Sequence, residues 1–249
     1  MSGHSKWATI KRKKGALDAK RGRMFSKVIK EITVAARMGG GDLSGNPRLR
    51  RAIDDAKASS MPADNITRAI KKGTGDLEGV SYEEITYEGV GPNGTLWLIE
   101  VLTDNRNRTA PELRKIFDKH NGALGAAGVA AWAFDAKGVL TMAKEAATEE
   151  QLFELAVGAG AQDVVDDGEE WWIETPPAVL DAVRAALEGA KLVVKSAGVQ
   201  QIARTPKIVE AHDAQVCLNL LETLEDHDDA QKVWSDFEPS EEALAALEA

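Results

Sequence analysis

The fold is decided by the stretch GVLTMAKEAATEEQLFELAVGAGAQDVVDDGEEWWIETPPAVLDAVRAALEGAKLVVKSAGVQQIAR, which occupies residues 138–204. Apolar runs of strand length alternate there with amphipathic segments of helical period, in the order β-α-β-β-α-β. Thr148-Glu149-Glu150-Gln151 predicts the start of the first helix, because it has the pattern of a capping box. The expected strands are residues 139–142, 163–165, 171–174 and 192–202, and the expected helices are residues 148–158 and 177–188. This order is typical of a ferredoxin-like domain.

The segments on either side of this stretch predict a second sheet domain. Residues 82–90 and 95–103 form a predicted hairpin around Gly91-Pro92-Asn93-Gly94. A helix is expected from the capping box Thr109-Ala110-Pro111-Glu112 to His120, followed by a strand at residues 129–134. After Pro206 a helix at residues 213–225 and a strand at residues 231–234 complete the same set of elements. We therefore expect the ferredoxin-like domain to be inserted into this second domain.

Residues before 76 have a helical period. Apolar stripes predict one helix from Met24, which the glycines of residues 38–41 end, a second after Pro47, and a third that Gly73-Thr74-Gly75 closes. Residues 1–16 have no clear period and are expected to form an arm that orders on a partner. The predicted fold class is α+β: an N-terminal three-helix domain followed by two ferredoxin-like α+β domains, the third inserted into the second. The predicted boundaries are 1–75, 76–136 with 205–238, 137–204, and an acidic tail at 239–249.

The cysteine content indicates a protein of a reducing compartment. The chain has 249 residues and a single cysteine, Cys217, which cannot form an internal disulfide and is expected in the core. The longest stretch without a charge runs from Asn121 to Phe134, short of the ~18 residues that a membrane span requires. No apolar run of signal-peptide length follows the basic N-terminus. A cytoplasmic protein without a membrane partner is therefore expected.

Charge is divided sharply along the chain. Residues 1–75 hold 18 Lys and Arg against six Asp and Glu, a net charge of +12, whereas residues 76–249 carry −21. A basic module joined to an acidic body predicts one end that binds a phosphate backbone, and acidic domains that are open to a protein partner. The candidate nucleic-acid-binding residues are Lys6, Trp7, Lys11, Arg12, Lys13, Lys14, Lys20, Arg21, Arg23, Lys27, Lys30, Arg48, Arg50, Arg51, Lys71 and Lys72.

Two features leave alternatives open. Trp7, which lies among cations, could stack on a base or anchor the arm on the helices. Asn105, Arg106, Asn107 and Arg108 form a candidate second site for phosphate at a helix N-terminus, or else an internal loop salt-bridged by Asp104.

The sequence predicts no catalytic, metal or cofactor site. The four histidines lack the spacing of metal ligands, and no nucleophile-elbow, Walker or dinucleotide-binding motif is present. The acidic residues within 224–229 lack the glycine and the alternating oxygen ligands of a calcium loop, so a solvated turn is expected there. We therefore expect a protein that is not an enzyme.

The chain resembles the YebC family, which includes the mitochondrial translational activator of cytochrome oxidase. The resemblance begins at Ser2-Gly3-His4-Ser5-Lys6-Trp7 and covers nearly the whole chain. Its further motifs are Ile10-Lys11, Asp18-Ala19-Lys20-Arg21-Gly22, Asn46-Pro47-Arg48-Leu49-Arg50, residues 61–66, residues 69–75, Tyr87-Glu88-Gly89, residues 102–109 and residues 224–229. It implies a helical N-terminal domain and two α+β domains.

The resemblance implies a regulator of gene expression that binds nucleic acid. The usual family description, a DNA-binding transcriptional regulator, is the first expectation, and a factor that binds ribosomal RNA or the ribosome and relieves stalling, for example at proline runs, is the alternative. A protein-only adaptor that works through the acidic domains is third. The predicted helices present Lys and Arg but few Asn or Gln, which favours readout of backbone and shape over readout of bases.

Overall fold

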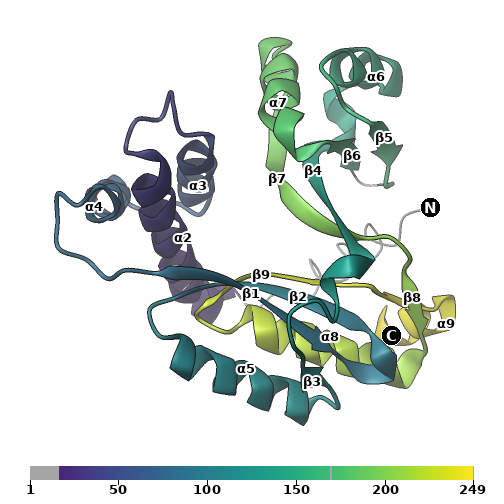
Figure 1. Ribbon diagram of the computed structural model, residues 1–249. Coiled ribbons are helices and arrows are strands. Elements are labelled where there is room, and N and C mark those ends of the chain that lie inside the picture. Colours follow the sequence, from purple (N-terminus) through teal and green to yellow (C-terminus); the bar gives the residue numbers. More distant parts are fainter. Residues whose placement is uncertain (1–16, 169, 249) are drawn as a thin grey trace. The chain divides into compact units, whose positions relative to one another are not determined.

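The computed structural model describes residues 17–168 and 170–248, and for residues 17–21 and 248 it describes the backbone alone (Figure 1). These residues fall into two compact units. Residues 134–204 form one, and residues 17–133 with 205–248 form the other.

Three helices form the N-terminal part of the larger unit: α2 (Leu17–Gly39), α3 (Pro47–Ala58) and α4 (Ala63–Thr74). Their apolar stripes meet in one core, which confirms the predicted three-helix domain. Helix α2 begins before the first residue of the predicted stripe, Met24. It ends in the predicted glycines because Gly40 adopts a φ of +79°, which a residue with a side chain rarely does.

Two polar or small residues fix how these helices pack. The amide of Asn46 caps α3 by accepting from the N–H of Leu49 at 3.0 Å, and its Nδ2 donates to the carbonyls of Ala35 and Gly40 at 2.8 Å each. On α4, a Cβ at Gly73 would lie 2.4 Å from the carbonyl oxygen of Thr33. Asn46 therefore ties α3 to the end of α2, and only glycine at position 73 lets α4 approach α2 so closely.

The rest of the larger unit is built on a four-stranded antiparallel sheet in the order β3-β1-β2-β9. Its strands are β1 (Glu83–Val90), β2 (Leu96–Thr103), β3 (Ala123–Leu124) and β9 (Ala230–Ser235). Helices α5 (Arg106–Lys119) and α8 (Ala211–Glu225) pack against one face around Trp97, Ile99, Phe117 and Cys217 (Figure 1). Because β9 pairs with β2 only after the long excursion of residues 134–204, the predicted insertion is confirmed.

Two local predictions in this domain were wrong. Helix α5 is capped by Asn105, whose side chain accepts from the N–H of Arg108, and not by Thr109, whose hydroxyl donates to Asp229. Residues 129–134 do not form a strand: a 3-10 turn occupies Ala131–Ala133, and Phe134 opens the next strand. The buried carboxylate of Glu88 holds this loop by accepting from the N–H groups of residues 128, 130 and 131 at 2.7–2.8 Å.

The inserted unit has the predicted β-α-β-β-α-β order. Its elements are β4 (Phe134–Ala143), α6 (Glu149–Gly158), β5 (Asp163–Asp166), β6 (Glu170–Thr175), α7 (Leu180–Gly189) and β7 (Val194–Ala203). The strands pair antiparallel in the order β5-β6-β4-β7, which is the ferredoxin-like arrangement. The predicted capping box at Thr148 and Gln151 is present with both of its hydrogen bonds.

The C-terminal residues add elements that the sequence did not predict. Strands β8 (Lys207–Val209) and β10 (Phe237–Pro239) form a parallel pair. Where an acidic tail was expected, helix α9 (Glu241–Glu248) follows, and its Ala243 is buried with Val209 and Ala214. Within the described part of the chain, no helix combines the length and the apolar character needed to cross a bilayer.

Candidate nucleic-acid interface

The candidate nucleic-acid-binding residues divide into three groups. Six of them lie outside the described residues: Lys6, Trp7, Lys11, Arg12, Lys13 and Lys14. Lys20 and Arg21 lie on the first turns of α2, where only the backbone is described. The other eight have described side chains, and the structure assigns them different surroundings.

We call the part of the larger unit that is built on the β3-β1-β2-β9 sheet the central domain. Three cations of α2 contact an acidic turn of this domain. We call residues 225–229, from the last residue of α8 to the residue before β9, the acidic turn. Arg23 lies 3.7 Å from the carboxylate of Asp226, and the Lys27 ammonium donates to the carbonyl of Glu225. Lys30 donates to the carbonyl of Asp228 at 3.0 Å and to the carboxylate of Asp229 at 2.6 Å. Residues 23, 27 and 30 share one face of the helix, because they are spaced by four and three positions. This cationic face is therefore occupied within the protein.

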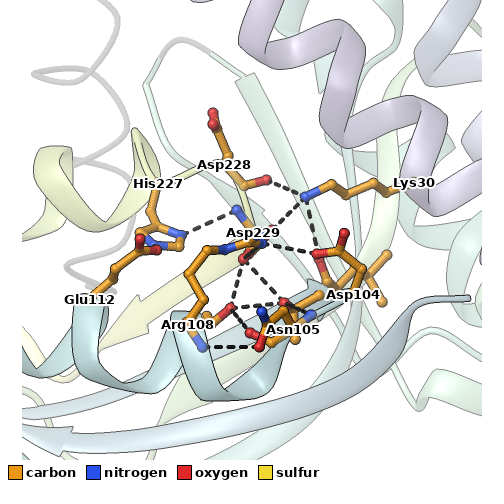
Figure 2. A network of polar contacts seen from close by, with 11 residues as sticks. Lys30, Asp104, Asn105, Arg108, Glu112, His227, Asp228 and Asp229 are labelled. Atoms are coloured by element: carbon orange, nitrogen blue, oxygen red, sulfur yellow. Dashed lines mark hydrogen bonds and ion pairs between the residues drawn. The ribbon is translucent and has the colours of Figure 1, made fainter. Parts of the chain in front are cut away.

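Asp229 is the centre of a network that joins three segments (Figure 2). Its side chain is 2% exposed. One carboxylate oxygen accepts from Lys30 of α2. The other accepts from Arg108 at 2.8 Å, from Thr109 at 2.7 Å and from Thr103 at 3.2 Å. The network therefore joins α2, the acidic turn and the start of α5.

The network fixes the charge of Asp229. Burial alone would raise the pKa of its carboxyl, but the hydrogen bonds from Lys30, Arg108 and Thr109 outweigh burial and hold the pKa well below its ordinary value. The same contact raises the pKa of the Arg108 guanidinium. A carboxylate with this set of charge-assisted donors is a permanent anion at neutral pH.

An open groove of about 980 Å³ surrounds the exposed side of this network. Acidic and basic side chains both line it, among them Arg23, Lys30, Arg108, Glu112 and Asp226. His227 lies in its wall, where Nδ1 accepts from the N–H of Asp229 at 3.1 Å and Nε2 lies 3.0 Å from the carboxylate of Glu112 (Figure 2). Because Nδ1 accepts, we place the proton of the neutral ring on Nε2, where it donates to Glu112.

The cations of α3 and α4 have two kinds of surroundings. Arg48 is paired with Glu31 at 2.6 Å and Glu84 at 2.9 Å, and Arg51 is half-buried with polar contacts of its own. In contrast, Arg50 of α3 and two residues of α4, Lys71 and Lys72, are exposed, and none of them has an ion pair within the described residues. These three cations are therefore available to a partner.

The second candidate site, residues 105–108, is used in part by the protein itself. Asn105 caps α5, and Arg108 is bonded to Asp104 at 3.0 Å as well as to Asp229. Arg106 and Asn107 are exposed. For Arg108 the internal loop is therefore what the structure shows, although the principal anion is Asp229 rather than Asp104.

Family models match nearly all of this architecture. The model of the TACO1/YebC N-terminal domain matches residues 5–76, and the model of the TACO1/YebC second and third domains matches residues 82–237. The chain belongs to the TACO1/YebC family. The resemblance inferred from the sequence motifs is thereby confirmed.

Bacterial TACO1/YebC relatives align over the full chain. A "probable transcriptional regulatory protein" of Citrifermentans bemidjiense is 53% identical over 99% of this chain and 100% of the relative. A protein of Geobacter sulfurreducens with the same description is 54% identical with the same coverage. The crystal structure of a conserved hypothetical protein from Aquifex aeolicus superposes with a TM-score of 0.83 at 42% identity. It covers 91% of this chain and 93% of its own.

Sequence reasoning missed the acidic turn as part of a network. The turn was expected to be solvated, and that expectation was wrong for Asp229, which is buried and bonded to four side chains. One signal was present: residues 102–109 and 224–229 both belong to the motifs that resemble the family. The structure shows that these two motifs lie against each other (Figure 2).

Proposed function

We propose that this chain is a nucleic-acid-binding regulator of gene expression, and in first place a DNA-binding transcriptional regulator. The observation that carries the proposal is the charge division, with +12 on residues 1–75 and −21 on the remainder. A phosphate backbone attracts the first part and repels the second, so binding orients the molecule with its helical end toward the nucleic acid. The descriptions of the bacterial relatives as transcriptional regulatory proteins support the same role.

The proposed interface comprises the N-terminal cations and the exposed side chains of α3 and α4. Lys6, Lys11, Arg12, Lys13 and Lys14 supply the densest charge, and Trp7 supplies a stacking group or an anchor. Arg50, Lys71 and Lys72 extend the interface over the helical domain, where no internal carboxylate neutralises them within the described residues.

A ribosome-associated translation factor is the second candidate, and one observation favours it. Residues 1–75 contain no glutamine and only two asparagines, Asn46 and Asn65. Asn46 is buried, and both polar atoms of its amide are bonded to backbone. The helical domain is therefore poor in the amide side chains that read adenine in the major groove, and backbone or shape readout suits ribosomal RNA as well as DNA.

The two candidates are separated by finding where the protein is bound in growing cells. A transcriptional regulator gives discrete DNA crosslinks across the genome and sediments free of ribosomes. A translation factor co-sediments with ribosomes in a salt-sensitive manner and gives no enriched DNA sites. A protein that gives neither signal acts instead as an adaptor through its acidic domains, and that result refutes the nucleic-acid proposal.

A further inference from the structure

The cationic face of α2 is already in contact with anions. Arg23, Lys27 and Lys30 are three of the sequence candidates for phosphate contacts, yet each of them contacts the acidic turn. The turn presents carboxylates and carbonyl oxygens to one side of a helix, as a phosphate backbone does. A cation cannot bind both partners at full strength, because its donors are shared between them.

We propose that the acidic turn is an internal competitor for this face. It holds Arg23, Lys27 and Lys30 against the end of the central sheet until a phosphate backbone displaces it, and the displacement releases α2. The proposal rests on the nucleic-acid-binding function proposed above, because the competitor acts only on a protein that binds a polyanion.

The contacts have the character that a displaceable competitor requires. The pair between Arg23 and Asp226 is open to solvent, with exposed fractions of 40% and 46%, so salt and other anions reach it readily. The Lys30 side chain is only 13% exposed, so its pair with Asp229 is the stronger contact. The pair between Arg23 and Asp226 is therefore displaced first. The pair between Lys30 and Asp229 determines how strongly a ligand must bind to release α2.

Asp229 remains satisfied after α2 leaves. Arg108, Thr109 and Thr103 still donate to it, and all three belong to the central domain. Loss of the Lys30 contact therefore does not leave the buried carboxylate of Asp229 without a partner. An unpaired buried charge would cost several kcal/mol and would prevent release. The central domain can therefore exist in a released state, and that state presents all three α2 cations to a ligand.

Affinity tests the competition. The probes are a short DNA duplex and inorganic polyphosphate, each titrated into the full chain at several salt concentrations. Asp226→Asn with Asp229→Asn weakens the competitor and is expected to tighten binding about three- to tenfold at low salt. Asp118→Asn with Glu222→Gln is the matched control, because it removes the same charge from exposed sites that have no ion pair within the described chain. Equal effects of the two double variants would mean general repulsion and would overturn the proposal.

A distance measurement tests the release and stays informative if the first variant folds poorly. Dyes are placed on the full chain through Met38→Cys on α2 and Arg114→Cys on α5, both at exposed positions, while the native Cys217 is buried. The efficiency of energy transfer between the dyes is expected to change when the DNA duplex or the polyphosphate is added. It is expected to change in the same direction at high salt without either ligand. Binding at saturation with no change in transfer overturns the proposal. A protein that binds neither probe refutes the proposed function instead, and the salt arm still reports whether α2 is released.

Discussion

Lys30 and Asp229 lie 199 positions apart in the chain and 2.6 Å apart in the structure. The contact joins the helical domain to the central domain, where β9, an edge strand of the four-stranded sheet, begins immediately after Asp229. It is one of the ion pairs between the basic residues 1–75 and the acidic remainder of the chain.

Asp229→Asn is expected to lower the free energy of unfolding by about 3 kcal/mol, because Lys30 and Arg108 lose their shared buried anion. Chemical denaturation of the full chain measures the change. Asp228→Asn is the control: its exposed side chain has no ion pair within the described residues, and we expect a change within about 0.5 kcal/mol. Equal losses for the two variants would contradict the central place of Asp229.

The same residue predicts a pH dependence. The pKa of Asp229 is lowered in the folded state, so its contribution is complete above the unfolded value of about 4 and is lost as pH falls through the lower folded value. The stability difference between wild type and Asp229→Asn is therefore expected to be constant from pH 8 to about pH 5. It should then shrink in more acid solution. A difference that grew on acidification would have the wrong sign.

Gly73→Ala is expected to destabilise the helical domain by about 2 kcal/mol, because the new Cβ would lie 2.4 Å from the Thr33 carbonyl and 2.6 Å from the Ala36 Cβ. Gly22→Ala is the matched control in α2, where a Cβ meets no atom of the described residues within 4 Å. That change removes a helix glycine in open space and should stabilise the chain by up to about 1 kcal/mol. Thermal melts of the two variants should therefore move in opposite directions.

Removal of residues 1–16 is expected to abolish most binding to DNA or ribosomal RNA, because this segment carries the densest positive charge. Since α2 begins at Leu17, the described helices should keep their circular dichroism and melting temperature. If the intact chain contacts about six phosphates, the logarithm of its affinity falls with the logarithm of salt at a slope near −5. Unimpaired binding by the shortened chain would place the interface elsewhere.

Lys71→Ala and Lys72→Ala should each weaken nucleic-acid binding modestly and reduce the steepness of the salt dependence by about one. Both cations are exposed on α4 and have no ion pair within the described chain. Lys119→Ala on α5 removes a charge that is also exposed, but from the acidic body, and should leave the slope unchanged. Fluorescence anisotropy at four or more salt concentrations distinguishes the two sites.

Cys217 offers a probe of the central core. Burial raises the pKa of its thiol to about 12, so almost no reactive thiolate is present at neutral pH. Iodoacetamide should modify the native chain very slowly and the urea-unfolded chain at the rate of a free thiol. Rapid modification of the native protein would show that α8 detaches from the sheet without global unfolding.

Local pattern was sufficient for most of the fold and insufficient where distant residues decide the structure. Thr148 caps α6 as predicted, because both hydrogen bonds of its capping box lie within four residues. Thr109 has the same sequence pattern, but its hydroxyl donates to Asp229, which lies 120 positions away in the chain. The helix is capped by Asn105 instead. Likewise, the apolar run before Phe134 has strand character, and the Glu88 carboxylate bends it into a loop. No window of neighbouring residues contains those partners.

The candidate site divides in the same way. The net charge predicts that residues 1–75 bind nucleic acid, but it does not show which of their cations form ion pairs within the protein. Arg48 and Arg50 are two positions apart on α3, yet Arg48 is paired with Glu31 and Glu84 whereas Arg50 is exposed. The difference arises because successive positions of a helix face different directions, and only one of these directions meets the carboxylates of the neighbouring segments.

The insertion has a consequence for synthesis on the ribosome. One edge of strand β2 pairs with β1, and its other edge pairs with β9, through residues such as Trp97 with Ser235. Because translation adds about 5–20 residues per second, the edge of β2 that pairs with β9 stays unpaired for roughly ten seconds. The inserted unit can fold during this time, because its strands pair with one another. An unpaired edge on a strand with apolar side chains is a template for aggregation during this interval. The nascent chain is therefore most vulnerable to misassembly after the insertion has folded and before residue 230 emerges.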